Sequence, residues 1–163
     1  MSPSLPTRKE INFYDELCSR DACQHFFGKS LEEAEALFRE NPLYYGFDLL
    51  WMGPVAFRFY LPAAIRFIVS DHAALQSGFI KQFCDTLSLR LVHELFAELV
   101  PVAEQLADIC DYIVGHWSKF DVDEKIYGSL QRSEVVQLQQ IFKQLPTTPP
   151  LNTTISQRFE RTP

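Results

Sequence analysis

The sequence predicts an all-α fold, a single-domain array or bundle of six to seven helices. Apolar residues recur at spacings of three and four along most of the chain, and no run alternates as a half-buried strand would. With 163 residues, 47% hydrophobic and 22% charged, the chain has an ordinary globular composition and enough length to bury one core. We expect a flexible N-terminus over residues 1–11, a helical domain over 12–145, and a disordered or partner-bound tail over 146–163.

Capping signals place the first two helices. Asn12 is expected to cap a helix that runs to about Phe27. Ser30 and Glu33 have the spacing of a capping box, in which each side chain accepts a hydrogen bond from the backbone amide of the other residue. Asn41-Pro42 should end this second helix, because a residue before proline avoids helical backbone angles.

Two prolines divide the next, strongly apolar stretch. Residues 43–53 have no clean period and could form a short helix around 47–52. Gly53-Pro54 should begin another, since proline is tolerated in a first turn. Pro62 cannot donate to the carbonyl of Arg58, so we expect a kink or a new helix there.

Three further helices follow in the second half of the chain. Asp71 is expected to cap a helix that continues to about Leu91 and that could restart at Ser77. The clearest amphipathic pattern covers 101–117, and a last helix is expected over 133–145, capped by its serine. Together with the earlier segments, these make the predicted six or seven helices.

The charge distribution argues against nucleic acid as a partner. The formal net charge is -6, but residues 1–10 and 146–163 each carry +1, so the body between them carries -8. Binding a phosphate backbone needs clustered lysine and arginine. We therefore expect no nucleic-acid partner.

Targeting and redox signals favour the cytoplasm. The first residues, MSPSLPTRKEIN, lack the apolar core of a signal peptide, and charges or prolines interrupt the longest apolar stretch, so no membrane partner is expected. We accordingly expect the four cysteines (Cys18, Cys23, Cys84 and Cys110) to be free thiols in a reducing compartment.

Three motif-like groups suggest metal chemistry and are better explained otherwise. Cys18, Cys23 and His25 lack the close C-x2-C spacing and the second ligand pair of a structural zinc site. Residues 121–132 begin like a calcium loop but have no glycine at the sixth position and no glutamate at the twelfth. The third group lies on one side of the 101–117 helix and is best interpreted as a solvated acidic face with a nearby histidine: Glu104, Asp108, Asp111 and His116. We predict no metal site and no cofactor.

No catalytic motif is present. Ser70, Asp71 and His72 are consecutive, and neighbours at a helix start point in different directions, so they cannot converge as a hydrolase triad. There is no G-x-S-x-G, no glycine-rich phosphate loop and no H-E-x-x-H. An enzyme is therefore the less favoured interpretation, and no catalytic residue is proposed.

The segment 44–67 is unusually aromatic. It contains eight aromatic residues together with Arg58 and Arg66, and tyrosine, tryptophan and arginine are enriched at binding hot spots. The alternative, which we favour, is that the segment forms the centre of the core, because buried aromatic side chains in a domain of this size need no further explanation. The candidate ligand- or partner-binding residues are Tyr44, Tyr45, Trp51, Arg58, Tyr60 and Arg66.

The block Gly53-Pro54-Val55-Ala56-Phe57-Arg58-Phe59-Tyr60-Leu61-Pro62-Ala63-Ala64 resembles a P-x-A-F-R-[FY]-Y-L-P-A motif of a group of uncharacterised bacterial helical proteins. This resemblance implies a bacterial helical domain and transfers no activity or site residue.

Two functional hypotheses follow. The first is a non-catalytic protein-binding domain of adaptor or immunity type, consistent with the acidic body and the absence of catalytic motifs. The alternative is a small-molecule binder or enzyme with an aromatic and arginine-lined pocket formed by residues 44–67. Exposure of these side chains in the folded protein would distinguish the two.

Overall fold

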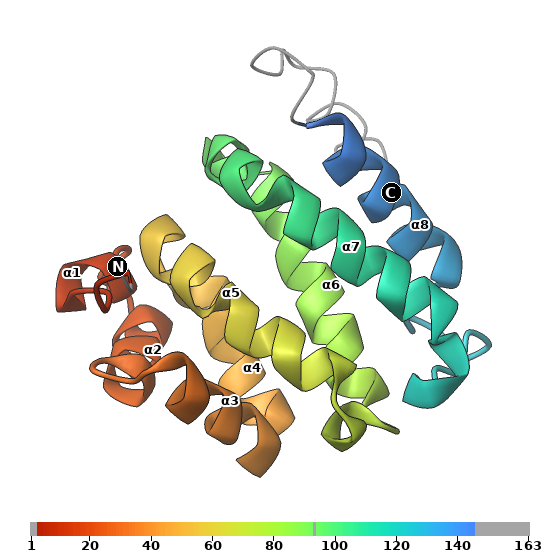
Figure 1. Ribbon diagram of the computed structural model, residues 1–163, viewed down its shortest axis with the longest axis horizontal. Coiled ribbons are helices and arrows are strands. Elements are labelled where there is room, and N and C mark those ends of the chain that lie inside the picture. Colours follow the sequence, from red (N-terminus) through yellow and green to blue (C-terminus); the bar gives the residue numbers. More distant parts are fainter. Residues whose placement is uncertain (1–2, 93, 146–163) are drawn as a thin grey trace. The chain divides into compact units, whose positions relative to one another are not determined.

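The computed structural model describes residues 3–92 and 94–145, and within them the all-α prediction is confirmed. These residues form eight α-helices and three short 3-10 helices, with no strand (Figure 1). The helix beyond the predicted number is α1, a single turn near the N-terminus that the sequence pattern does not predict. The predicted tail over 146–163 lies outside the described residues.

The helices follow one another with short connections. The α-helices are α1 (Arg8–Ile11), α2 (Leu17–Phe26), α3 (Leu31–Glu40), α4 (Pro42–Trp51), α5 (Pro54–Val69), α6 (Ser77–Val92), α7 (Ala103–Gly115) and α8 (Arg132–Gln144). The 3-10 helices are η1 (Asp71–Ala73), η2 (Glu94–Val102) and η3 (Trp117–Phe120).

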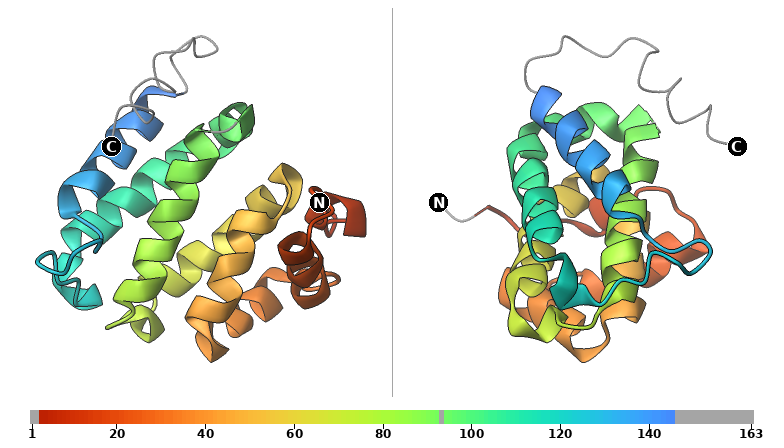
Figure 2. Two further views of the ribbon diagram at one scale, coloured as in Figure 1. Left: turned by 180° about the vertical axis from the view of Figure 1, so that it is seen from behind. Right: turned by 90° about the vertical axis from the view of Figure 1, so that its right-hand side faces the viewer.

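Contacts group the described residues into two compact units. Unit 1 contains residues 3–83 and 118–121, and unit 2 contains the described residues of 84–117 and 122–145. In unit 1, α2 packs against α4, and α3 packs against both α4 and α5. Figure 1 shows α5 in front of α4, and the left view of Figure 2 brings α4 to the front.

The core of unit 1 is built from aromatic rings. Phe38 of α3 is fully buried, and its ring centroid lies 5.7 Å from that of Phe26, 6.4 Å from that of Phe67 and 5.8 Å from that of Phe79. Phe67 and Phe79 meet edge to face at 4.8 Å, a favoured aromatic geometry. Four helices, α2, α3, α5 and α6, are thereby joined at one cluster.

Unit 2 is dominated by the pair α7 and α8. These helices lie side by side and run in opposite directions (Figures 1 and 2). Ile109, Cys110 and Ile113 of α7 and Leu138 and Phe142 of α8 are buried, as the amphipathic pattern of 101–117 predicts.

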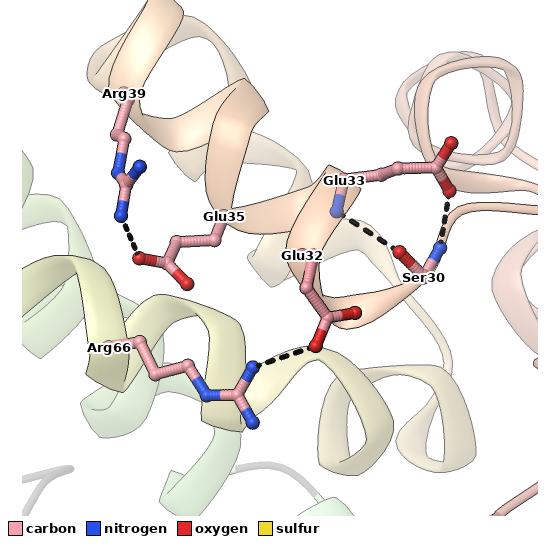
Figure 3. Close-up of polar contacts among 6 residues, drawn as sticks. All are labelled: Ser30, Glu32, Glu33, Glu35, Arg39 and Arg66. Carbon is pink, nitrogen blue, oxygen red and sulfur yellow. Dashed lines mark hydrogen bonds and ion pairs between the residues drawn. The ribbon is translucent and has the colours of Figure 1, made fainter.

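The predicted capping box at the start of α3 is confirmed. The Glu33 amide donates to Ser30 Oγ at 3.1 Å, and the Ser30 amide donates to Glu33 Oε2 at 2.8 Å (Figure 3). Asn41 then has a double role, because it ends α3 and its side chain accepts from the Tyr44 amide to cap α4. With this cap and Pro42 in its first turn, α4 begins five residues earlier than predicted.

The predicted start of the first helix at Asn12 is wrong. Asn12 ends α1, whose first turn is capped by Thr7 and Glu10, and α2 begins only at Leu17. Asp15 has φ 52°, a left-handed conformation that turns the chain between the two helices. The strong local cap at Thr7 outweighed the capping potential of Asn12.

Three other boundaries differ from the predictions. Pro62 starts no new helix, because α5 runs through it from Pro54 to Val69, and the other expected outcome, a kink at Pro62, stays a prediction. Asp71 caps no long helix. It lies in η1, and α6 begins at Ser77, the alternative start. In α8 the serine at 133 lies inside the first turn, and the amide of Gln131 donates instead to Glu134 Oε2 at 2.8 Å.

A close backbone approach at Gly53 holds the N-terminal segment on unit 1. The Gly53 amide donates to the Ile11 carbonyl at 3.2 Å. A Cβ on Gly53 would lie 2.3 Å from the Glu10 carbonyl oxygen and 2.4 Å from Phe13 Cβ, closer than atoms can pack. Glycine is therefore required where residues 10–13 cross the start of α5.

We expect Gly53→Ala to lower the free energy of unfolding by about 1–3 kcal/mol, since the added methyl group must displace residues 10–13. Urea denaturation followed by tryptophan fluorescence and circular dichroism measures this change. Gly115→Ala is the matched control, because its Cβ would meet no atom within 4 Å and alanine favours helix. Equal effects of the two substitutions would contradict the expectation.

Among the residues that the structure describes, no helix is both long enough and apolar enough to span a membrane.

Candidate functional site

A pocket of about 410 Å³ lies in unit 1 where α2 faces α4. Its walls come mainly from these two helices, with one residue of α6 and the residue that caps α4. The lining residues are Cys18, Asp21, His25, Asn41, Leu43, Tyr44, Phe47, Asp48 and Gln82. A volume of this size is within the range of small-ligand sites.

Helical periodicity explains why these residues share one cavity. Cys18, Asp21 and His25 are three and four residues apart on α2, which places them on one face of that helix. Tyr44, Phe47 and Asp48 have the same spacings on α4. The two faces meet because α2 packs directly against α4.

A buried carboxylate paired with a histidine forms the wall of the pocket. His25 Nδ1 lies 2.7 Å from Asp48 Oδ2, and the side chain of Asp48 is only 4% exposed. Burial raises the pKa of Asp48 to about 6, although the hydrogen bond from His25 and the charge of His25 act in the opposite direction. The negative charge of Asp21 adds to the increase in this pKa.

The second nitrogen of the imidazole is also engaged. Tyr44 Oη lies 3.1 Å from His25 Nε2, and the two rings are 5.0 Å apart. The ring of Tyr45 meets His25 edge to face at 5.3 Å. His25 is thus held at both nitrogens and along one edge, and Asp48, His25 and Tyr44 form a continuous hydrogen-bonded series.

Gln82 closes the pocket from α6. Its Nε2 donates to the Leu43 carbonyl at 3.1 Å. A Cβ on Gly46 would lie 2.6 Å from Gln82 Oε1 and 2.8 Å from Phe79 Cε2. The glycine therefore lets α4 approach α6 closely enough for Gln82 to reach the pocket wall.

Cys18 is half-buried at the pocket, whereas Cys23, Cys84 and Cys110 are buried. It does not form a nucleophile and base pair with His25, because seven residues of helix separate them by about 10 Å along the axis. Burial raises the pKa of the Cys110 thiol to about 12. Cys18 is therefore the thiol best placed to react with a reagent in solution.

The six residues predicted as a binding set do not come together at one site. Tyr44 lines the pocket, and Tyr45 packs behind it against His25 and Phe26. Tyr60 is fully buried in the core. Its hydroxyl donates to the Phe26 carbonyl at 2.7 Å and lies 2.9 Å from the Lys29 carbonyl, and burial raises its pKa to about 12.

Trp51, Arg58 and Arg66, like Tyr45 and Tyr60, lie outside the pocket lining. Trp51 is half-buried, and its Nε1 is buried with no hydrogen-bond partner among the described residues. Arg58 is half-buried on α5. Arg66 is exposed and faces α3, where its Nη1 lies 3.5 Å from Glu32 Oε1 (Figure 3). An exposed ion pair of this kind contributes little to stability.

Neither Asp48 nor the pairing of His25 with it was predicted from the sequence. Asp48 is the one carboxylate in the apolar run of residues 43–53. Because acidic side chains are almost never fully buried unless paired, a lone aspartate in such a run signals a buried partner. His25 was considered only as a metal ligand. Within the described residues, no group of three or more histidine, cysteine, aspartate or glutamate side chains is arranged to hold a metal ion.

Comparison with known proteins finds no match for this chain. No protein-family model matches this chain, and no curated protein and no solved structure matches it. The resemblance of residues 53–64 to a bacterial helical group therefore stays a prediction.

Proposed function

We propose that this protein is a small-ligand-binding domain and that the pocket between α2 and α4 is its binding site. The observation that carries the proposal is the Asp48, His25 and Tyr44 series in the pocket wall. Convergent polar groups beside aromatic and aliphatic wall residues such as Phe47 and Leu43 are typical of ligand sites. A small-molecule binder was the alternative hypothesis drawn from the sequence. The site proposed here keeps Tyr44 from the predicted residues and replaces the others with residues mainly of α2 and α4.

The test uses Cys18 as a reporter, since its thiol lines the pocket and the other three cysteines are buried. A trifluoromethyl label on Cys18 is followed by fluorine NMR during titration with small amines, alcohols and carboxylates. We expect at least one compound to shift the resonance in a saturable manner.

Two variants with the same substitution show whether the pocket is responsible. Leu43→Trp should fill the cavity and abolish the shift, because Leu43 lines it. Leu89→Trp should leave the shift intact, because Leu89 is similarly exposed but lies outside the lining. If no compound of the three classes binds, or if both variants behave alike, the proposal is wrong.

A second candidate function is protein binding at the same face. Leu43 and Phe47 line the pocket and are 53% and 43% exposed, and Leu17, which is 74% exposed, lies one turn before Asp21 on α2. Exposed apolar side chains of this kind mark interaction surfaces. A photo-reactive amino acid at position 17, compared with one at position 89, tests this in cells. The absence of any product specific to position 17 would remove the support for this candidate.

We also propose a cytoplasmic location. All four cysteines are free thiols, which is typical of proteins in a reducing compartment. A bacterial origin, an adaptor or immunity-type role and the absence of a nucleic-acid partner stay predictions from the sequence.

A further inference from the structure

The hydrogen-bonded series in the pocket wall has a direction. An ionised carboxylate only accepts hydrogen bonds, so Asp48 requires the proton of a neutral His25 to be on Nδ1. In this neutral form Nε2 carries a lone pair, and the hydroxyl of Tyr44 donates its proton to it. The Tyr44 oxygen consequently has only lone pairs left to offer a ligand.

The charged groups of the pocket also favour a ligand that donates hydrogen bonds. Its nine lining residues, all of them described by the structure, include the carboxylates of Asp21 and Asp48 and no lysine or arginine. Asp21 is exposed at α2, and Asp48 is buried at α4. A ligand that donates hydrogen bonds and carries positive charge would offset this unbalanced negative charge.

The apolar walls define the rest of the ligand. Leu43 and Phe47 contribute hydrocarbon surface, and the rings of Tyr44 and Phe47 can lie against a cation. Aromatic rings attract cations, ammonium groups included, through the negative potential of their faces. A short apolar body that ends in an amine fits both parts of this cavity.

We infer that the ligand of the pocket between α2 and α4 is a small organic amine, bound as its ammonium ion through the Tyr44 oxygen and the carboxylates of Asp21 and Asp48. This inference rests on the proposed ligand-binding function and specifies its ligand class. The ammonium donates hydrogen bonds to these acceptors, and the apolar body packs on Leu43 and Phe47.

Three probes that share one phenyl body test this assignment: 2-phenylethylamine, 2-phenylethanol and phenylacetate. Binding is measured by isothermal titration calorimetry on the unlabelled wild-type protein. We expect the amine to bind about tenfold more tightly than the alcohol, because it adds charge-assisted hydrogen bonds and a cation and aromatic contact. Phenylacetate should bind more weakly than either.

Two conservative variants assign the preference to named groups. Asp21→Asn and Tyr44→Phe should each weaken amine binding about fivefold and leave alcohol binding nearly unchanged, since each removes an acceptor or charge used by the ammonium. Asp108→Asn, an exposed carboxylate on α7, is the control and should change neither.

The outcomes separate this inference from the function on which it rests. If the alcohol or phenylacetate binds as well as the amine, and Leu43→Trp still abolishes binding, the ligand-binding function stands and the amine assignment is overturned. The assignment is also overturned if Asp21→Asn and Tyr44→Phe leave the preference for the amine intact. If none of the three probes binds, the proposed function and the amine assignment both fail.

Discussion

Asp48→Asn is expected to stabilise unit 1 at neutral and alkaline pH by up to about 3 kcal/mol. Burial raises the pKa of the wild-type carboxyl to about 6, so an ionised Asp48 destabilises the folded state relative to a neutral side chain. Asparagine is nearly the same shape, and its Oδ1 can accept the hydrogen bond that His25 Nδ1 donates to Asp48.

The sign of the pH dependence follows from the two pKa values of Asp48. Its pKa is about 6 in the folded protein against 3.8 for an unperturbed aspartate, so between these values the folded state binds more protons than the unfolded state. The stability of the wild type should therefore decrease as pH rises from about 4 through 6, with the full loss present above 6. Asp48→Asn should remove this decrease.

Urea denaturation at about pH 4 and about pH 8 measures the effect. The two proteins should be similar in stability at the lower pH and differ most at the higher one. Asp108→Asn is the matched control and should be neutral at both, because Asp108 is exposed. If Asp48→Asn is instead the less stable protein at the higher pH, the hydrogen bond between the Asp48 carboxylate and His25 outweighs the cost of burying the carboxylate.

Phe38→Ala is expected to lower the free energy of unfolding by about 3–5 kcal/mol. Its fully buried ring contacts Phe26, Phe67 and Phe79, so truncation leaves a cavity where α2, α3, α5 and α6 meet. A loss of this size is a large share of the 5–15 kcal/mol by which domains are usually stable. The midpoint of urea denaturation should fall accordingly.

Phe47→Ala is the control for this substitution, since Phe47 is also helical but 43% exposed. We expect it to cost less than about 1 kcal/mol, because little buried contact is lost. Similar losses for the two variants would show that the aromatic cluster around Phe38 does not dominate the core.

The aromatic segment 44–67 is neither wholly core nor wholly surface. Phe57, Tyr60 and Phe67 on α5 are fully buried, whereas Tyr44 and Phe47 on α4 are 54% and 43% exposed. Composition could not separate these groups, because buried and exposed aromatics look alike in a sequence that has no clean period over 43–53. The division depends on which face of α4 the neighbouring helices cover.

Part of the proposed site could be predicted from the sequence. Tyr44 was among the predicted residues, and Asp48 could have been noticed as a carboxylate in an apolar run. Its partner could not be found, since His25 is 23 residues away on another helix and pairs with Asp48 only through the packing of α2 on α4. Arg58 and Arg66 were predicted with Tyr44 because they are near it in sequence, but α5 places neither of them in the pocket lining.

Local patterns were sufficient for the all-α class, the capping box of α3 and the buried faces of α7, because these depend on residues within one or two turns of each other. The passage of α5 through Pro62 and the pocket depended on the tertiary structure. Both reflect contacts between segments far apart in the chain, whose energies can outweigh local preferences of about 1–3 kcal/mol. The hydrogen-bonded series of Asp48, His25 and Tyr44, on which the proposed function depends, is one such contact.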